Sequence, residues 1–161
     1  MAGNTMNNVF WLVPNQLAGR SGPSRDPWSL PEPRAGGFDA ILNLTEIEPD
    51  RTEFVLAQLE LGWVPLPATY PANFETEQSC LKALPKAYKF LISHLEAGHK
   101  VLVHCAWGRD RTGLLLAYYL ARSEKLSPKQ AIARLRKVRP EAISPGWEEM
   151  SERVIAKLQA D

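Results

Sequence analysis

The sequence predicts an α/β fold with one mainly parallel central sheet of four or five strands, flanked by helices. Phe38–Leu44 (FDAILNL) and Lys100–Cys105 (KVLVHC) are nearly continuous apolar runs, which are typical of strands buried on both faces. Segments with helical periodicity alternate with such runs. Strands that alternate with helices pair in parallel through right-handed crossovers. In folds of this kind, the ligand site lies beyond the carboxyl ends of the strands.

Two short strands open the expected sheet. Val9–Val13 and Leu17–Gly19 have the residue types of strands, and Pro14-Asn15 between them is typical of a turn. The stretch 20–37 is rich in proline and glycine and has strand-like patterns on both sides. We therefore expect it to be a long surface loop inside the domain, followed by the strand at 38–44.

The middle of the chain is expected to contain two helices and one strand. The first helix runs from about residue 50 to 61, is closed by Gly62, and precedes a strand at Trp63–Leu66. The next segment has the clearest helical period, and Gly98 ends it. Pro85 lies inside this segment and predicts a kink or a break. The apolar stripe of this helix consists of Leu81, Leu84, Tyr88, Leu91, Ile92 and Leu95.

Three further helices are expected after the strand at 100–105, beginning near Thr112, Pro128 and Pro145. The last two each begin with the pair Ser-Pro. A serine side chain caps a helix N-terminus, and proline suits the first helical turn. We expect one domain over residues 1–161, with its core at about 9–159.

The composition excludes several classes of protein. Of 161 residues, 45% are hydrophobic and 23% charged, which is ordinary for a soluble globular domain. The 19 Lys and Arg against 18 Asp and Glu leave a net charge of +1, too small for a general binder of nucleic acid or membrane surfaces. No apolar run reaches the roughly 18 residues of a membrane span, and the N-terminus lacks the basic segment of a signal peptide. With two cysteines, Cys80 and Cys105, we expect a reduced, cytoplasmic monomer without disulfides.

The segment after the second buried strand has the features of an anion-binding loop. Cys105 ends the strand, five residues follow, and Arg111 stands at the start of the next helix. A tight loop between strand and helix can turn its backbone N–H groups around an anion, and the helix N-terminus adds positive charge there. Arg111 can bind two phosphate oxygens with its planar guanidinium group. The same donors stabilise a thiolate at Cys105, which predicts a nucleophile aimed at a bound phosphorus atom.

This phosphate-binding loop, HCAWGRDRTG at residues 104–113, resembles the His-Cys-x5-Arg-Ser/Thr-Gly signature of the cysteine-dependent protein tyrosine phosphatases. The chain is most similar to their small dual-specificity branch. The resemblance extends to residues 17–23 (LAGRSGP), to 38–46 (FDAILNLTE), and to Arg139-Pro140 and 144–147 (SPGW) near the end. The loop motif is specific, whereas the flanking similarities are weak one by one.

The resemblance implies a role for each residue of the loop. Cys105 attacks phosphorus and forms a phosphocysteine intermediate, while Arg111 and the amides of residues 106–111 bind the phosphoryl oxygens. His104 orders the loop and favours the ionised thiol. Thr112 hydrogen-bonds the sulfur and assists hydrolysis of the intermediate. The implied substrate-binding residues are Ala106, Trp107, Gly108, Arg109, Asp110 and Arg111. No metal or cofactor is expected.

The chain departs from the family pattern at the general acid. In the family, an aspartate protonates the leaving oxygen from the loop between the third sheet strand and the helix before the nucleophile strand. Here that loop, residues 67–75, contains no aspartate. Asp110 is placed as in the loops of myotubularin-type lipid phosphatases, and Glu75 lies on the expected loop. We expect Asp110 to be the acid; the alternatives are Glu75 and no side-chain acid.

Several residues near the motif have a structural interpretation beside a functional one. Trp107 either packs against the sheet edge or forms a wall that stacks on an aromatic phosphoester. Arg20, Arg25 and Arg109 are either surface charges or anchors for an anionic substrate. Cys80 is expected to be core packing, with a redox role as the alternative. The cluster of Arg134, Arg136, Lys137 and Arg139 is expected to be one solvated helix face.

The expected function is therefore hydrolysis of phosphate monoesters. Phosphotyrosine in proteins is the default substrate, with phosphoserine and phosphothreonine as further ones. One alternative is a phosphoinositide or inositol phosphate phosphatase, suggested by Asp110 and the extra arginines, although the bulky, apolar Trp107 argues against it. The other alternative is a pseudophosphatase that binds phosphate without turnover, suggested by the missing loop aspartate.

Overall fold

The computed structural model describes residues 6–160 and confirms a mainly parallel sheet. Its strands are β1 Phe10–Val13, β2 Leu17–Ser21, β3 Ala40–Asn43, β4 Glu60–Trp63 and β5 Val101–Cys105. The strand order is β1-β2-β5-β3-β4, and β1 pairs antiparallel with β2 while the other pairs are parallel. Because β5 is the central strand, the residue that ends it lies in the middle of one edge of the sheet.

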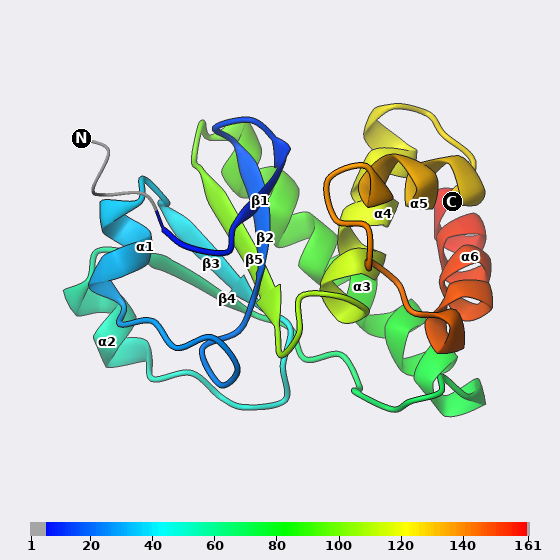
Figure 1. Cartoon of the computed structure of the whole chain (residues 1–161), viewed down its shortest axis with the longest axis horizontal. Helices are drawn as coiled ribbons and strands as arrows, with labels where there is room; N and C mark the ends of the chain where they lie inside the picture. Colours follow the sequence, from blue (N-terminus) through cyan, green and yellow to red (C-terminus); the bar gives the residue numbers. More distant parts are fainter. Residues whose placement is uncertain (1–5, 161) are drawn as a thin grey trace.

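Helices cover both faces of the sheet (Figure 1). They are α1 Pro31–Ala35, α2 Arg51–Leu56, α3 Phe74–Glu96, α4 Arg111–Ser123, α5 Pro128–Arg136 and α6 Pro145–Gln159. α1 and α2 lie on one face, where Phe54 of α2 packs with Ile41 and Leu102 of the sheet. α3 and α4 lie on the other face, and α5 and α6 pack on α4. None of these helices, within residues 6–160, is long and apolar enough to cross a membrane.

Side chains of β5 alternate between the two faces of the sheet. Val101, Val103 and Cys105 belong to the core beneath α3 and α4, whereas Leu102 and His104 face α1 and α2. All of them are buried. Cys105 and His104 are neighbours in the sequence, but their side chains therefore lie on opposite faces of the sheet.

The region of α2 and β4 differs from the sequence-based expectation. α2 ends at Leu56 rather than near residue 61, because Gln58 turns the chain with a φ of 58° in the left-handed region. β4 begins at Glu60, ahead of the strand that was expected at 63–66. The stretch 20–37 also contains the short helix α1, where only a loop was expected.

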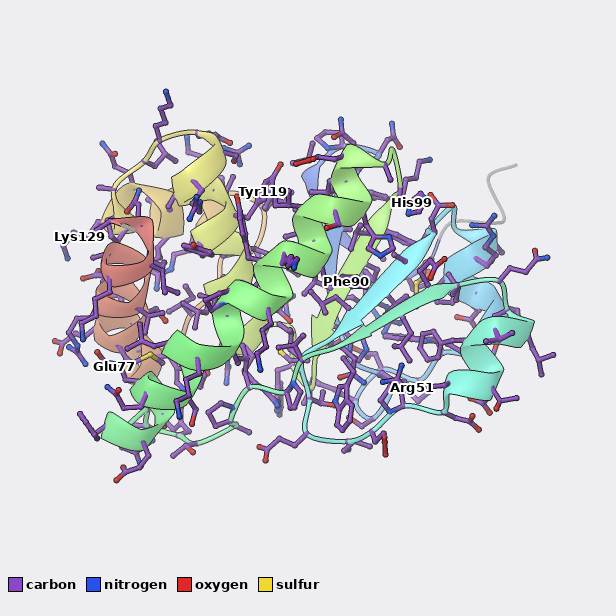
Figure 2. All side chains as sticks on the ribbon, turned by 180° about the vertical axis from the view of Figure 1, so that it is seen from behind. Arg51, Glu77, Phe90, His99, Tyr119 and Lys129 are labelled. Carbon is purple, nitrogen blue, oxygen red and sulfur yellow. The ribbon has the colours of Figure 1, made fainter. Side chains whose placement is uncertain are left out.

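Gly62 is a strand residue and not the expected helix cap. A Cβ at this position would lie 2.8 Å from the ring of Phe90 on α3 and 2.9 Å from a methyl group of Leu42. Glycine is therefore required for the close approach of α3 to the sheet. Figure 2 labels Phe90 on α3, which crosses the sheet in this view.

α3 is the longest helix of the described residues and continues through Pro85. It starts at Phe74, where Asn73 and Thr76 form a reciprocal capping box. Of the expected kink or break at Pro85, the break does not occur, since the helix runs uninterrupted to Glu96. Proline removes one helical hydrogen bond, and burial of the apolar face of α3 against the sheet offsets this loss. The buried apolar residues of α3 are Cys80, Leu84, Ala87 and Leu91.

The last three helices begin where the sequence indicates, but the caps of α5 and α6 differ. The Ser127 side chain accepts a hydrogen bond from a backbone N–H of α5 in a capping box. Ser144 precedes Pro145 and α6 in the same way, yet its side chain makes no cap. The expected cap at Ser144 is therefore wrong, and its hydroxyl group is used elsewhere.

Candidate active site

A cavity of about 250 Å³ at the carboxyl end of β5 gathers the residues that the sequence singled out. It contains both Cys105 and Arg111, and Tyr70 and Trp147 contribute aromatic walls. Its lining residues are Ala68, Tyr70, Cys105, Ala106, Trp107, Arg109, Asp110, Arg111 and Trp147. The predicted thiol and guanidinium group thus share one cavity.

A larger cavity of about 690 Å³ lies beside the loop after β2 and α2. It reaches His104 and also Cys105, and its lining includes the carboxylates of Asp50 and Glu53 but no arginine or lysine. An anion would meet repulsion there and no guanidinium group. We therefore expect a phosphate ester to bind in the smaller cavity.

The sulfur of Cys105 has a hydrogen-bond donor beside it. Thr112 Oγ1 donates to Cys105 Sγ at 3.1 Å. Thr112 and Arg111 lie in the first turn of α4, whose N-terminus carries partial positive charge. Cys105 and Arg111 are only 2% and 8% exposed, and low solvent access strengthens electrostatic interactions between such groups. This arrangement favours an anion bound next to the sulfur.

Gly108 adopts a backbone conformation, and a close approach to β2, that a residue with a side chain does not tolerate. Its φ is +67°, and a Cβ there would lie 2.6 Å from the backbone carbonyl carbon of Arg20 and 2.7 Å from the N atom of Ser21. The loop consequently lies directly against β2. Trp107 and Arg109 lie on either side of Gly108; the Trp107 side chain is exposed, whereas Arg109 is partly buried.

Hydrogen bonds from distant parts of the chain hold the loop in place. One donor lies in the segment after β2, and the others lie between α5 and α6. The bonds run from Gly22 N–H to Ala106 O (2.9 Å), from Arg139 Nη2 to Trp107 O (2.9 Å), from Ile143 N–H to Arg109 O (3.2 Å) and from Ser144 N–H to Asp110 Oδ1 (2.7 Å). The conformation of the loop is therefore set by tertiary contacts as well as by its own sequence.

Asp110 supplies the only carboxylate among the described residues that line the cavity of Cys105. Both of its oxygens accept hydrogen bonds from Ser144, Oδ1 from the backbone N–H at 2.7 Å and Oδ2 from the hydroxyl group at 2.9 Å. The hydroxyl that was expected to cap α6 thus binds Asp110 instead. Glu75, the alternative acid, is an exposed residue in the first turn of α3 and does not line this cavity.

His104 lies behind the loop, on the face of α1 and α2. Its Nδ1 is 3.2 Å from Cys105 O, and because a carbonyl oxygen only accepts, Nδ1 carries the proton. The ring packs edge-on against Trp28, with 5.2 Å between centroids. Burial, and to a smaller extent the charges of Arg20 and Arg111, lower the pKa of His104 to about 4. His104 is therefore neutral at pH 7 and acts on the loop through its hydrogen bond, not through a positive charge.

Acid is expected to destabilise the fold through His104. Its folded pKa of about 4 lies below the ordinary value of 6.5, so between these values the unfolded chain binds a proton that the folded chain does not. The stabilisation is fully present above pH 6.5 and is lost as the pH falls towards 4, on the order of 3 kcal/mol in total. Urea unfolding at pH 7 and pH 4.5 measures it, and His104→Asn should remove most of this pH dependence.

His94→Asn is the matched control for this prediction. Burial, and the neighbouring His99, also lower the pKa of His94, so its contribution has the same sign. Its ring is only partly buried, so we expect His94→Asn to change the pH dependence of unfolding less than His104→Asn does. Equal pH dependence of unfolding in the wild type and in His104→Asn would contradict the assignment to His104.

Two of the arginines have contacts that the sequence did not predict. Arg20, expected at the surface, is 3% exposed; its Nε donates to Asn7 O at 2.8 Å and its Nη1 to Asp26 O at 2.9 Å. Arg136, expected on a solvated helix face, donates from Nη2 to Ile143 O at 2.7 Å. Both bind backbone carbonyls of segments that the sequence alone does not bring near them.

Of the remaining candidates, Trp107 lies at the cavity, whereas Cys80 is part of the hydrophobic core. Trp107 is half exposed and forms a wall of the cavity, and Arg25 lies over its ring at 3.4 Å from the centroid. Cys80 is fully buried in the core, and burial raises the pKa of its thiol to about 12, so this thiol is protonated at pH 7. Residues 6–160 contain no cluster of three or more His, Cys, Asp or Glu side chains that fits a metal ion.

Comparison with known proteins identifies the family of the chain. The sequence profile described as "Dual specificity phosphatase, catalytic domain" matches residues 28–153, which include the whole loop from His104 to Gly113. The chain belongs to this family. The resemblance noted from the loop is thereby confirmed.

Relatives of this phosphatase domain are distant. A protein of Invertebrate iridescent virus 3, named as a tyrosine phosphatase, is 26% identical over 146 residues, covering 89% of this chain and 59% of that protein. The human phosphatidylglycerophosphatase and protein-tyrosine phosphatase 1 is 36% identical over 59 residues, covering 37% of this chain and 29% of that protein. The chain thus spans at most 59% of the length of either relative.

A solved structure agrees with the fold of the phosphatase domain. The crystal structure of Tk-PTP in its active form has a TM-score of 0.77, with 97% of this chain and 99% of that chain covered at 22% identity. At this identity the likeness establishes the fold alone. Together with the family match, it confirms the α/β architecture and the position of Cys105 at the end of β5.

Proposed function

We propose that this phosphatase domain hydrolyses phosphotyrosine in proteins, and phosphoserine or phosphothreonine more slowly, with Cys105 as nucleophile, Arg111 as phosphate ligand and Asp110 as general acid. One observation carries the proposal: the 250 Å³ cavity holds a thiol, two guanidinium groups and a single carboxylate between aromatic side chains. Aromatic walls suit the ring of an aryl phosphate. A cytoplasmic location and a monomeric state remain predictions.

In the first step of the proposed mechanism, the Cys105 thiolate attacks phosphorus and the bond from phosphorus to the ester oxygen breaks. The leaving oxygen takes a proton from Asp110. Arg111 and the amides of residues 106–111 bind the phosphoryl oxygens, because the charge of a loose transition state is spread over them. The product of this step is a phosphocysteine, a dephosphorylated alcohol and an ionised Asp110.

Water completes the reaction in the second step. Its oxygen attacks phosphorus, the bond from phosphorus to sulfur breaks, and Asp110 takes a proton from the water. The Thr112 hydroxyl, 3.1 Å from the sulfur, stabilises the departing thiolate. The enzyme returns to its starting state, with inorganic phosphate released. Division into two steps lowers the barrier that direct hydrolysis would meet.

Substrate comparison tests the proposed function. Hydrolysis of p-nitrophenyl phosphate is measured first, with EDTA present, followed by kcat/KM for phosphotyrosine, phosphoserine and phosphothreonine peptides of one sequence. We expect EDTA-resistant turnover with the phosphotyrosine peptide preferred. Absence of turnover in a protein that still binds inorganic phosphate would instead support a phosphate-binding pseudophosphatase.

A phosphoinositide or inositol phosphate is the second candidate substrate. The human relative has both a lipid phosphatase and a protein-tyrosine phosphatase in its name. Several arginines lie near the cavity, as a polyphosphorylated ring would require. The same assay decides between the candidates: a kcat/KM for inositol phosphates far above that for phosphotyrosine peptides would replace the protein substrate with this one.

Asp110→Asn is expected to flatten the basic limb of the pH–rate profile, because the acid that donates the proton is lost. The amide keeps the shape of the side chain and its contact with Ser144 N–H. The rate should fall by about 10²-fold with an alkyl phosphate and much less with p-nitrophenyl phosphate, whose leaving group needs little protonation. Profiles of kcat from pH 5 to 8 measure both effects. Glu75→Gln is the control, and a flattened limb in that variant alone would transfer the role to Glu75.

A further inference from the structure

The larger cavity, of about 690 Å³, has no part in the proposed reaction. It lies on the face of α1 and α2, which Figure 1 shows at the end of the molecule opposite α5 and α6. Its volume falls in the range of cavities that hold small molecules, about 300–1,000 Å³. As in such sites, the walls are mainly apolar, and they include Trp28, Leu30, Ile47, Pro49, Phe54 and Leu56.

His104 forms part of the buried end of this cavity. The residue is 4% exposed, and its Nδ1–H donates to Cys105 O, so Nε2 of the neutral ring is a hydrogen-bond acceptor. Nε2 has no hydrogen-bond partner among residues 6–160, yet it is accessible to solvent. Because His104 lines the larger cavity and not the cavity of Cys105, a ligand reaches Nε2 through the larger cavity. A ligand with an N–H or O–H group would supply the missing donor.

The mouth of the cavity carries negative charge. Asp50 and Glu53 line the cavity and are exposed, and neither forms an ion pair within residues 6–160. Arg51 stands between them in the sequence but does not line the cavity; Figure 2 labels it on α2. A cationic group on a ligand would therefore be attracted to this mouth.

From these features we infer that the larger cavity binds a small aromatic amine. Its cationic group lies at the mouth beside Asp50 and Glu53, its ring packs between the apolar walls, and an N–H or O–H group donates to His104 Nε2. An aromatic ring suits this cavity because Trp28 and Phe54 supply aromatic side chains to pack against. The inference goes beyond the proposed function, since it assigns a ligand to a cavity that the reaction does not use.

A ligand in this cavity would also stabilise the phosphate-binding loop. The same ring that accepts at Nε2 lies with Nδ1 3.2 Å from Cys105 O, and Gly22, another lining residue, donates to Ala106 O at 2.9 Å. Hydrogen bonds in series strengthen one another, so a donor at Nε2 makes Nδ1–H a stronger donor to the loop. We therefore expect the amine to tighten phosphate binding at Cys105, and phosphate to tighten amine binding by the same factor.

Three indole compounds test the site by calorimetric titration at pH 7. Tryptamine carries both the cation and the indole N–H donor, 1-methyltryptamine lacks this donor, and indole-3-propionate carries a carboxylate in place of the ammonium group. Tryptamine should bind about tenfold more tightly than indole-3-propionate and about threefold more tightly than 1-methyltryptamine. Equal affinities for the three compounds would overturn the inference.

Glu53→Gln should lower the affinity for tryptamine about threefold and leave hydrolysis of p-nitrophenyl phosphate unchanged. Glu96→Gln is the matched control, because Glu96 is an exposed carboxylate at the end of α3, outside the cavity. It should change neither quantity. An unchanged affinity in Glu53→Gln, or an equal loss in both variants, would overturn the assignment to this cavity.

Inorganic phosphate distinguishes the larger cavity from the cavity of Cys105. At saturating phosphate, the affinity for tryptamine should rise about twofold. A fall would show that the two ligands compete for the cavity of Cys105, which would overturn the assignment to the larger cavity, and an unchanged affinity would overturn the coupling to the loop. Hydrolysis of p-nitrophenyl phosphate judges the proposed function separately.

Discussion

Serine in place of Cys105 is expected to lower kcat for p-nitrophenyl phosphate by about 10⁴-fold or more. A serine hydroxyl is not ionised near pH 7, and the residues that line the cavity include no histidine to take its proton. Thr112, the neighbour of the sulfur, is a hydrogen-bond donor and does not replace a base. Steady-state kinetics at pH 6 with both proteins at equal concentration gives the ratio directly.

The same variant should keep the phosphate site intact. Serine is smaller than cysteine, and the loop hydrogen bonds to residues 106, 107, 109 and 110 do not involve the sulfur. We therefore expect titration with inorganic phosphate to give similar affinities for both proteins. Retention of more than about 1% of the rate would contradict thiolate catalysis, which supplies the covalent step.

Arg111→Lys is expected to lower kcat by about 10³-fold although the charge is kept. Lysine presents a point charge, whereas the guanidinium fork of arginine contacts two phosphoryl oxygens at once and follows them into the transition state. Arg111 is 8% exposed at the first position of α4, so water cannot take over this role. The loss should appear in kcat more than in KM, since the contact is strongest in the transition state.

Arg122→Lys is the control for this substitution. It makes the same change at the other end of α4, where Arg122 Nη1 donates to the Tyr118 hydroxyl group at 2.9 Å, remote from the cavity. Its kcat should equal that of the wild type. A similar loss in both variants would trace the effect to the stability of α4 and not to contact with phosphate.

The loop could be predicted from the sequence because its chemistry lies in consecutive residues. The order of strand, cysteine, tight turn and helix start follows from local patterns around residues 100–113, and glycine at 108 suits a positive φ. The alternation of strands and helices along the sequence was sufficient to predict a mainly parallel sheet. The structure confirms the α/β class and the parallel pairing. These features depend on short-range propensity and periodicity.

The partners of the loop could not be predicted in the same way. Ser144 looks like an ordinary helix cap in the sequence, and only the fold brings its hydroxyl to Asp110, 34 residues away. Arg139 looks like a surface charge until α5 places it beside Trp107. Such contacts have no period and no local motif. They were missed because they arise from packing between segments that are remote in the chain.

The misplaced boundary between α2 and β4 has a different cause. The apolar residues Leu59 and Leu61 extend a helical pattern, and Gly62 follows them as a typical helix end. The chain instead turns at Gln58, which has no side-chain preference for the left-handed region. Packing of Gly62 beneath Phe90 outweighs this local signal. Tertiary structure overrides propensity most easily in such short elements.

Hydrogen bonds reach the loop from Gly22 and from residues 139–144, so catalytic turnover requires these distant segments to be folded against it. A chain that has formed its helices but has not yet brought these segments against the loop lacks these hydrogen bonds. Contacts between distant segments form late, because closing long loops carries an entropic cost. In a refolding experiment, helical circular dichroism should therefore recover before activity does. We therefore expect activity only in molecules in which these distant segments have come together.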